Sequence, residues 1–190
     1  MKSNTAQKIL DVAQSMVRQR GYSAFSYADI AEQVGIRKAS IHYHFSSKEK
    51  LVKELVIRYR HILSRQCQEI EEQKARPQEQ LQAFVNLYRD GLQEHKICLC
   101  GMLTADFAVL NSEIQAELQA FFFATESWLS KLLKRGSEAK VWQCNQSFES
   151  EAKSIIAMLQ GAQLLARVAN HSEETFDEIT QSFLQDKLGN

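Results

Sequence analysis

The chain has 190 residues, 44% of them hydrophobic, with one proline and seven glycines. This length suits one or two small domains, and so few prolines and glycines argue against sandwiches, barrels and long linkers. Residues 1–55 carry nine Lys/Arg against five Asp/Glu, whereas residues 56–190 carry fourteen against eighteen, so the formally neutral chain has a basic N-terminal part. We therefore expect an all-α protein of which only the N-terminal part approaches a polyanion.

Membrane-spanning and disulfide-rich classes do not fit the sequence. No apolar run approaches the roughly 20 residues that span a bilayer, and the first residues, MKSNTAQKILDVAQ, contain no apolar signal-peptide core. The four cysteines are too few and too scattered for a disulfide framework; they are Cys67, Cys98, Cys100 and Cys144. We expect a soluble, cytoplasmic protein.

The first fifty residues predict three helices. One spans residues 4–20 and ends at Gly21, because glycine suits the left-handed position that closes a helix. A second runs from the N-cap Ser26 to Gly35, and a third covers residues 38–44. The tight turn between the last two indicates a helix-turn-helix.

The third predicted helix offers hydrogen-bond donors and no acids. There is no Asp or Glu between Gln33 and Ser47. Phosphates repel carboxylates, and base edges in the major groove offer acceptors, so this helix fits a DNA groove. Its outward residues are Arg37, Lys38, Ser40, His42 and Tyr43. We expect Arg37 and Lys38 to read guanine, the commonest base contact of these residue types.

The remainder predicts further helices, about nine in the whole chain. They are expected at residues 47–75, 77–95, 102–110, 112–135, 147–170 and 172–188, with a break at 96–101 and a helix end at Gly136. We divide the chain into a helix-turn-helix DNA-binding domain, residues 1–46, and a helical ligand-binding and dimerisation domain, residues 47–190.

Residues 35–51, GIRKASIHYHFSSKEKL, resemble the TetR family of bacterial transcriptional regulators. That family has a small helix-turn-helix ending in a Tyr-x-His-Phe-like tetrad, then Ser/Asn-Lys-Glu and a long helix. The resemblance implies that Tyr43 and Lys48 hold phosphates. Expected DNA contacts are Ser26, Tyr27, Arg37, Lys38, Ser40, His42, Tyr43, His44 and Lys48. For His44 a buried structural role is an equal alternative.

Small residues in the middle of the 147–170 helix indicate close helix packing. This helix is apolar over more than one stripe, so we expect it to meet a second copy together with the 172–188 helix, as a four-helix bundle. The resemblance implies the same homodimer. The expected interface residues are Ile155, Met158, Leu159, Gly161, Ala162, Leu165, Phe176 and Phe183.

Aromatic residues in the second part suggest an apolar effector cavity between the helices from residue 47 to residue 170. Its candidate lining is Phe84, Tyr88, Met102, Phe107, Phe122 and Trp128, which favours a neutral or aromatic ligand; ordinary core packing is the alternative. Arg89, Glu94 and Asp106 are candidate polar anchors, with exposed surface positions as the alternative.

Cys98 and Cys100 lie in an expected loop after His95 and Lys96. They are interpreted first as small apolar core residues. Alternatively they sense electrophiles or redox state, since nearby Lys96 and His95 would lower a thiol pKa. The surrounding segment is similar to the branch of the TetR family that includes NemR. A metal site formed by His95, Cys98 and Cys100 is a further alternative, but the cysteines lack the usual C-x₂₋₄-C spacing. An enzyme that uses His95 and Cys98 as base and nucleophile would need a group that orients the base, and none is evident. We therefore expect no metal, no cofactor and no catalysis.

Together these patterns predict a homodimeric, ligand- or redox-responsive DNA-binding transcriptional regulator. We interpret it as a repressor that a small neutral, aromatic or electrophilic effector releases from a palindromic operator. An activator and an architectural DNA-binding protein without ligand control are the alternatives. The expected partners are double-stranded DNA, a second copy of the chain and an effector of unknown identity.

Overall fold

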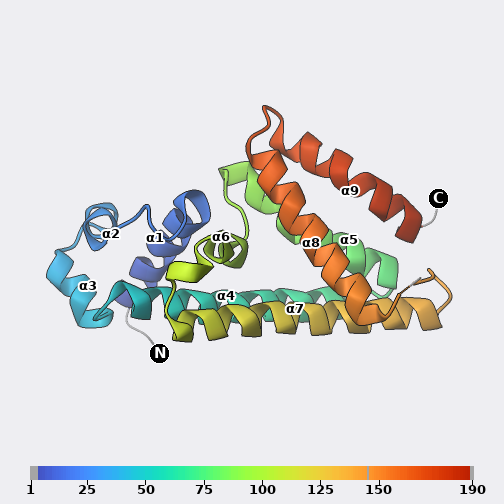
Figure 1. Ribbon diagram of the computed structural model, residues 1–190, viewed down its shortest axis with the longest axis horizontal. Helices are drawn as coiled ribbons and strands as arrows, with labels where there is room; N and C mark the ends of the chain where they lie inside the picture. The colour runs from blue at the N-terminus through green and yellow to red at the C-terminus, as the bar shows by residue number, and fades with distance from the viewer. Residues whose placement is uncertain (1–3, 145, 189–190) are drawn as a thin grey trace. The chain divides into compact units, whose positions relative to one another are not determined.

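The computed structural model describes residues 4–144 and 146–188, and its regular elements within these ranges are all helices (Figure 1). The α-helices are α1 (Asn4–Arg20), α2 (Tyr27–Val34), α3 (Lys38–His44), α4 (Lys48–Gln73), α5 (Pro77–Arg89), α6 (Leu99–Ala105), α7 (Ser112–Glu138), α8 (Phe148–Arg167) and α9 (Ser172–Leu188). Two 3₁₀ helices are η1 (Asp90–Glu94) and η2 (Phe107–Val109). The all-α prediction is confirmed.

The chain packs into two compact units. One comprises residues 4–61 and 99–121, and the other residues 62–98 together with the described residues from 122 onward. The polypeptide therefore enters each unit twice. The boundary after residue 46 remains a prediction about where the DNA-contacting part ends, whereas these units are defined by packing.

In the first unit, α1 carries a buried stripe against α2, α3 and α6. The stripe is Ala6, Ile9, Leu10, Ala13, Met16 and Val17, at helical spacing. Gly21 closes α1 with φ +84° and Gly35 closes α2 with φ +75°, both in the left-handed region as predicted. Because side chains other than glycine are strained at such φ values, these two residues set where the helices end.

α6 begins earlier than predicted. The sequence placed a break at 96–101 and a helix from Met102, but α6 runs from Leu99 to Ala105 with Gly101 inside it. Its buried residues, Leu99, Cys100 and Leu103, form one apolar side of the helix, and α6 packs against α1 (Figure 1). Burial of that side outweighs the cost of one helical glycine, about 1 kcal/mol.

The predicted helix end at Gly136 is wrong. α7 continues to Glu138, and Lys140 takes the left-handed conformation with φ 57°. At Gly136 the Trp142 ring lies so close that a Cβ atom would stand 2.0 Å from its Cζ2. The glycine is thus present for close packing and not for a helix end.

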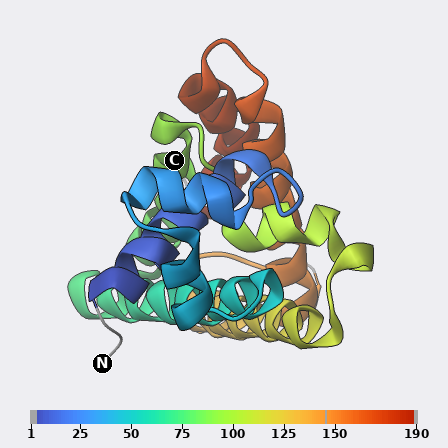
Figure 2. The same ribbon diagram turned by 90° about the vertical axis from the view of Figure 1, so that its left-hand side faces the viewer.

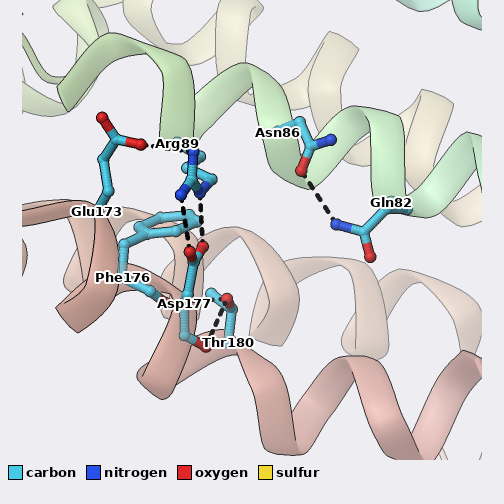
Figure 3. Close-up of polar contacts among 7 residues, drawn as sticks. All are labelled: Gln82, Asn86, Arg89, Glu173, Phe176, Asp177 and Thr180. Atoms are coloured by element: carbon cyan, nitrogen blue, oxygen red, sulfur yellow. Dashed lines mark hydrogen bonds and ion pairs between the residues drawn. The ribbon is translucent and has the colours of Figure 1, made fainter. Parts of the chain in front are cut away.

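In the second unit, α5, α8 and α9 pack against one another (Figure 1). Phe84 of α5, Leu159 of α8 and Phe176 of α9 are fully buried there. Arg89 fastens α5 to α9, because its guanidinium donates to both carboxylate oxygens of Asp177 at 2.7 and 2.8 Å and pairs with Glu173 at 2.6 Å (Figure 3). Arg89, a candidate effector anchor, is therefore used in joining two helices.

Three other helices end a few residues before the predicted positions. α4 ends at Gln73, two residues before the expected end. α5 ends at Arg89 and continues as η1, which His95 closes in the left-handed region with φ 54°. α8 ends at Arg167, three residues early. None of the helices in the described ranges combines the length and the hydropathy of a membrane span.

Candidate nucleic-acid interface

α3 exposes the residues that the sequence assigned to DNA. Ile41 is fully buried and anchors the helix, whereas Arg37, Lys38 and His42 are exposed. Tyr43 is 86% exposed, an unusual position for a large aromatic side chain, and its ring meets the His44 ring edge-on at 5.1 Å. Figure 2 turns the side of α2 and α3 toward the viewer. The predicted donors are thus available on one short helix, with Ser40 and His44 half-buried at its edge.

Ser26 and Asp29 form the capping box that begins α2. The Ser26 N–H donates to Asp29 Oδ2 at 2.6 Å, and the Asp29 N–H donates to Ser26 Oγ at 3.4 Å. Hydrogen bonds from the Ser26 hydroxyl, and then from the Ser26 N–H, lower the pKa of the Asp29 carboxyl group. The Ser26 hydroxyl also donates to Asp29 at 2.7 Å, so any contact with DNA competes with a bond it already makes.

Tyr27 has a role besides the predicted phosphate contact. Its ring is buried, its hydroxyl donates to the Phe45 carbonyl oxygen at 2.9 Å, and its edge meets the His42 ring at 4.8 Å. Burial, and then the charge of Glu49, raise the pKa of Tyr27 to about 12. These contacts give the side chain a positioning role beside α3, and its contact with the DNA backbone stays a prediction.

The Lys48 side chain packs against Phe25 and Tyr22, in the turn before α2. Its ammonium group donates to the Phe25 carbonyl oxygen at 2.6 Å and lies 4.2 Å from the Phe25 ring centre and 4.7 Å from that of Tyr22. Burial lowers the pKa of Lys48. An ammonium has three donors, so a phosphate contact by Lys48 stays a prediction for the donors that Phe25 does not use.

The effector candidates divide between the two units. Phe84 stacks on Trp128 at 5.1 Å and meets Tyr88 at 5.5 Å in the second unit, where Phe122 is half-buried. Met102 and Phe107 belong to the first unit. Met102 lies beside Gly21, and Phe107 is exposed.

Two buried polar groups of the second unit, one of them in this aromatic cluster, bear on a ligand site. Trp128 Nε1 of α7 and Gln160 Nε2 of α8 are buried, and neither has a hydrogen-bond partner among the described residues. Buried donors without an acceptor cost about 1–3 kcal/mol each, so each needs an explanation. The sequence could not indicate them, because a helical pattern does not show which donors lack partners.

The other polar anchors are also used within the chain. Asp106 accepts a hydrogen bond from the Tyr22 N–H at 3.1 Å, and Glu94 pairs with Lys96. Sequence analysis did not anticipate the contact between Asp106 and Tyr22, because the two residues are 84 positions apart.

Cys98 and Cys100 are buried and take part in no disulfide, Cys98 directly before α6 and Cys100 in its first turn. The Cys98 N–H donates to Gln163 Oε1 at 2.9 Å, and Gln163 Nε2 donates to the Tyr88 carbonyl oxygen at 2.6 Å. Lys96, the expected activating cation, pairs with Glu94. Within the described residues no cluster of three His, Cys, Asp or Glu side chains suits a metal ion. This geometry favours the packing interpretation of both cysteines.

The expected dimer residues separate into two groups. Ile155, Leu159, Ala162 and Phe176 are buried within the single chain and belong to its core. Leu165 is 60% exposed, and the same turns of α8 expose Leu164 and Val168. Met158, Gly161 and Phe183 are half-buried. The surface open to a second copy is therefore narrower than the sequence suggested, and it includes Leu164 and Val168, which the interface prediction omitted.

Comparisons with known proteins agree with this geometry. The model of the family "Bacterial regulatory proteins, tetR family" matches residues 9–55. A solved TetR-family transcriptional regulator from Agrobacterium tumefaciens is 34% identical, with a TM-score of 0.92 over 97% of this chain and 98% of that chain. An uncharacterised HTH-type transcriptional regulator in the lacX 3′ region of Lactococcus lactis subsp. lactis is 27% identical over 98% of this chain and 95% of that protein.

The reduced form of NemR from E. coli is similar in fold. Its structure has a TM-score of 0.82 over 98% of both chains, at 18% sequence identity. Identity this low carries the fold but no property of the NemR cysteines.

Proposed function

Because the chain belongs to the TetR family of bacterial transcriptional regulators, we propose that it is a homodimeric repressor that an effector releases from a near-palindromic operator. Membership of the family establishes a DNA-binding transcriptional regulator and not an enzyme. The observation that carries the rest is the exposed, acid-free α3, with Arg37 and Lys38 at its start and Tyr43 at its end. As a regulator of bacterial type it would act in the cytoplasm, where the DNA is.

Each subunit places α3 in a major groove. Dimers of this kind bind half-sites one helical turn, roughly 34–36 Å, or a multiple of it, apart. Exposed Lys and Arg side chains neutralise phosphates, so affinity falls steeply as salt rises. A near-palindromic operator follows from two-fold symmetry of the dimer.

Lys38→Ala is expected to weaken binding to DNA from the region upstream of the protein's own gene. A lysine that reads a base contributes about 1–3 kcal/mol of discrimination, so affinity for this DNA should fall roughly 5- to 150-fold, with a smaller loss on random DNA. Fluorescence anisotropy titrations over a salt series measure both. Lys131→Ala, an exposed lysine of α7 in the second unit, is the matched control and should change little.

Equal losses on both DNAs would make Lys38 a phosphate contact only. Absence of salt-sensitive, sequence-preferring binding by the wild type to any promoter DNA would contradict the proposed function itself.

The dimer is proposed to form through the exposed part of α8, with α9 beside it. Leu165→Glu adds a charge where an apolar contact is expected, and burying an unpaired carboxylate is costly. We expect the dimer dissociation constant to rise by at least about tenfold, corresponding to about 1.4 kcal/mol. Sedimentation over a range of concentrations measures it. Val109→Glu places the same charge on an exposed apolar residue of η2 and serves as the control. Equal dimerisation of both variants would exclude this face.

The effector is proposed to be a small neutral or aromatic molecule bound in the second unit beside Phe84 and Trp128. An acceptor on such a ligand would satisfy Trp128 Nε1 or Gln160 Nε2, two of the buried donor atoms that have no hydrogen-bond partner among the described residues. The effector shifts the operator-bound population only as far as its affinity differs between the two conformations.

An electrophile acting on Cys98 or Cys100 is the second candidate, and burial of both thiols weighs against it. The same DNA titration with and without N-ethylmaleimide, in wild type and in the Cys98→Ser/Cys100→Ser variant, separates the two. Release from DNA in the wild type alone would establish the electrophile, whereas unchanged binding in both directs the search to neutral ligands.

A further inference from the structure

An open groove of about 700 Å³ lies beside the recognition helix, within the first unit. Its walls include Tyr43 and His44 at the end of α3, and Lys50 and Lys53 in the first turns of α4. Tyr43 and His44 are themselves expected DNA contacts, so the groove continues the DNA-facing surface of α3 toward two lysines. Sequence analysis assigned no role to either lysine.

Glu113, in the first turn of α7, also lines this groove and occupies one of those lysines. The Lys53 ammonium lies 2.8 Å from Glu113 Oε2. Hydrogen bonding from Lys53 lowers the pKa of the Glu113 carboxyl group, so this group is charged at neutral pH. Both partners are solvent-accessible, with 35% of the Lys53 side chain and 64% of the Glu113 side chain exposed. Exposed ion pairs of this kind are weak, and another anion can therefore replace Glu113.

The charges of the groove are balanced as long as Glu113 is present. Lys50 and Lys53 face the carboxylates Glu54 and Glu113. A polyanion approaching the balanced groove gains little, whereas a groove without the Glu113 charge carries one net positive charge and attracts a phosphate.

We propose that this groove binds a phosphate of the DNA backbone flanking the α3 contacts, and that Glu113 is a built-in competitor that the phosphate must displace from Lys53. The inference rests on the proposed function and names a backbone contact of the same interface. As long as Glu113 holds Lys53, the phosphate keeps its condensed counterion, so the wild type makes this contact only in part and it contributes less than a full phosphate contact to the salt dependence. Glu113 thereby limits the sequence-independent part of the affinity, which favours discrimination between operator and other DNA.

The matched control lies further along the same two helices, about two turns on in α4 and about one turn on in α7. Arg60 of α4 pairs with Glu117 of α7 at 2.9 Å, and neither residue lines the groove. Glu113→Gln and Glu117→Gln remove the same charge from equivalent ion pairs. Any effect of net charge alone should therefore appear equally in both variants.

Glu113→Gln is expected to raise affinity for operator and for random DNA alike. Completing this phosphate contact steepens the slope of log K against log salt by up to about 0.9, which at 0.1 M salt corresponds to a gain of up to about eightfold. Glu117→Gln should stay within about twofold of wild type with an unchanged slope. Anisotropy titrations of the full-length protein measure the affinity and this slope. A salt series from about 0.05 to about 0.3 M covers the range in which such slopes are determined.

A Lys53→Gln background completes the test. Lys53→Gln alone should weaken DNA binding. When Glu113→Gln is added to Lys53→Gln, the gain in DNA affinity should be no larger than the gain that Glu117→Gln gives in the wild type. Equal effects of Glu113→Gln and Glu117→Gln, or a gain that persists without Lys53, would overturn the inference. Circular dichroism melts verify that each variant is folded. If the wild type binds its operator and Lys38→Ala weakens that binding while Glu113→Gln matches Glu117→Gln, only this inference fails and the proposed function stands.

Discussion

Gln163→Leu is expected to lower the free energy of unfolding by about 2–5 kcal/mol. Gln163 is 1% exposed in α8, where it donates to the Tyr88 carbonyl oxygen at 2.6 Å and accepts from the Cys98 N–H at 2.9 Å. Leucine has a similar volume but removes both of these buried hydrogen bonds, at about 1–3 kcal/mol for each. Urea unfolding followed by circular dichroism, at one fixed protein concentration because a dimer links stability to concentration, measures the loss.

Gln160→Leu supplies the comparison on the same helix. Gln160 is three residues away, and its Nε2 is buried without a partner among the described residues. Removing an unsatisfied donor takes away no hydrogen bond, so stability should stay within about 1 kcal/mol of wild type or increase. If both variants lost several kcal/mol, the general cost of changing α8 would explain the result, and the bridge formed by Gln163 would not.

The same pair of variants bears on regulation. Gln163 holds the chain at Cys98, the residue directly before α6, and α6 packs against α1 of the first unit. Gln160 is a proposed effector contact. Gln160→Leu should therefore keep both its stability and its DNA binding. Gln163→Leu should have a lower free energy of unfolding than the wild type.

Gly136→Ala is expected to destabilise the protein by up to about 2 kcal/mol, although alanine is the better helix former. A Cβ at this position would lie 2.0 Å from Trp142 Cζ2 and 2.2 Å from Cε2, distances at which the ring must move. Trp142 is buried, and its indole N–H donates to the Leu133 carbonyl oxygen at 2.9 Å, so a displaced ring loses burial and a hydrogen bond. Overpacking of this kind costs about 1–3 kcal/mol and outweighs the gain of about 1 kcal/mol in helix propensity. Thermal and urea unfolding measure the difference.

A double-mutant cycle isolates the cause. Trp142→Leu alone should destabilise, because it removes buried ring surface and the bond to Leu133. In that background Gly136→Ala should cost little, because the smaller side chain leaves room for the Cβ. An equal cost in both backgrounds would show that the conformation of Gly136, and not contact with Trp142, requires the glycine.

Local signals were sufficient for the first three helices. Ser26 caps α2 through its own neighbour Asp29, and Gly35 ends it in the left-handed region, contacts that span only a few residues. The donors of α3 could be assigned for the same reason, since the short helix repeats every 3.6 residues and Ile41 marks its buried side. The order of residues from Gly35 to Leu51 also sufficed to identify the family.

Contacts between distant residues could not be predicted in this way. The role of Tyr27 follows from Phe45 and that of Lys48 from Phe25, each brought close by the turns between the helices. A glycine in a helix looks like a helix end until Trp142 is seen to lie on it. Apolar pattern alone also could not separate Leu159, which is buried in the core, from Leu165, which is exposed for a second copy.

Periodicity, capping and residue order thus determine the helical class, the helix-turn-helix and its donors, because these depend on interactions within one or two helical turns. Tertiary structure decides which of those side chains remain available. It commits Arg89 to Asp177 across 88 residues and Gln163 to Cys98 across 65, and it places Glu113 against Lys53 across 60. The physical reason is that hydrogen bonds and ion pairs depend on distance in space, which the sequence of a helical protein specifies only after the helices have packed.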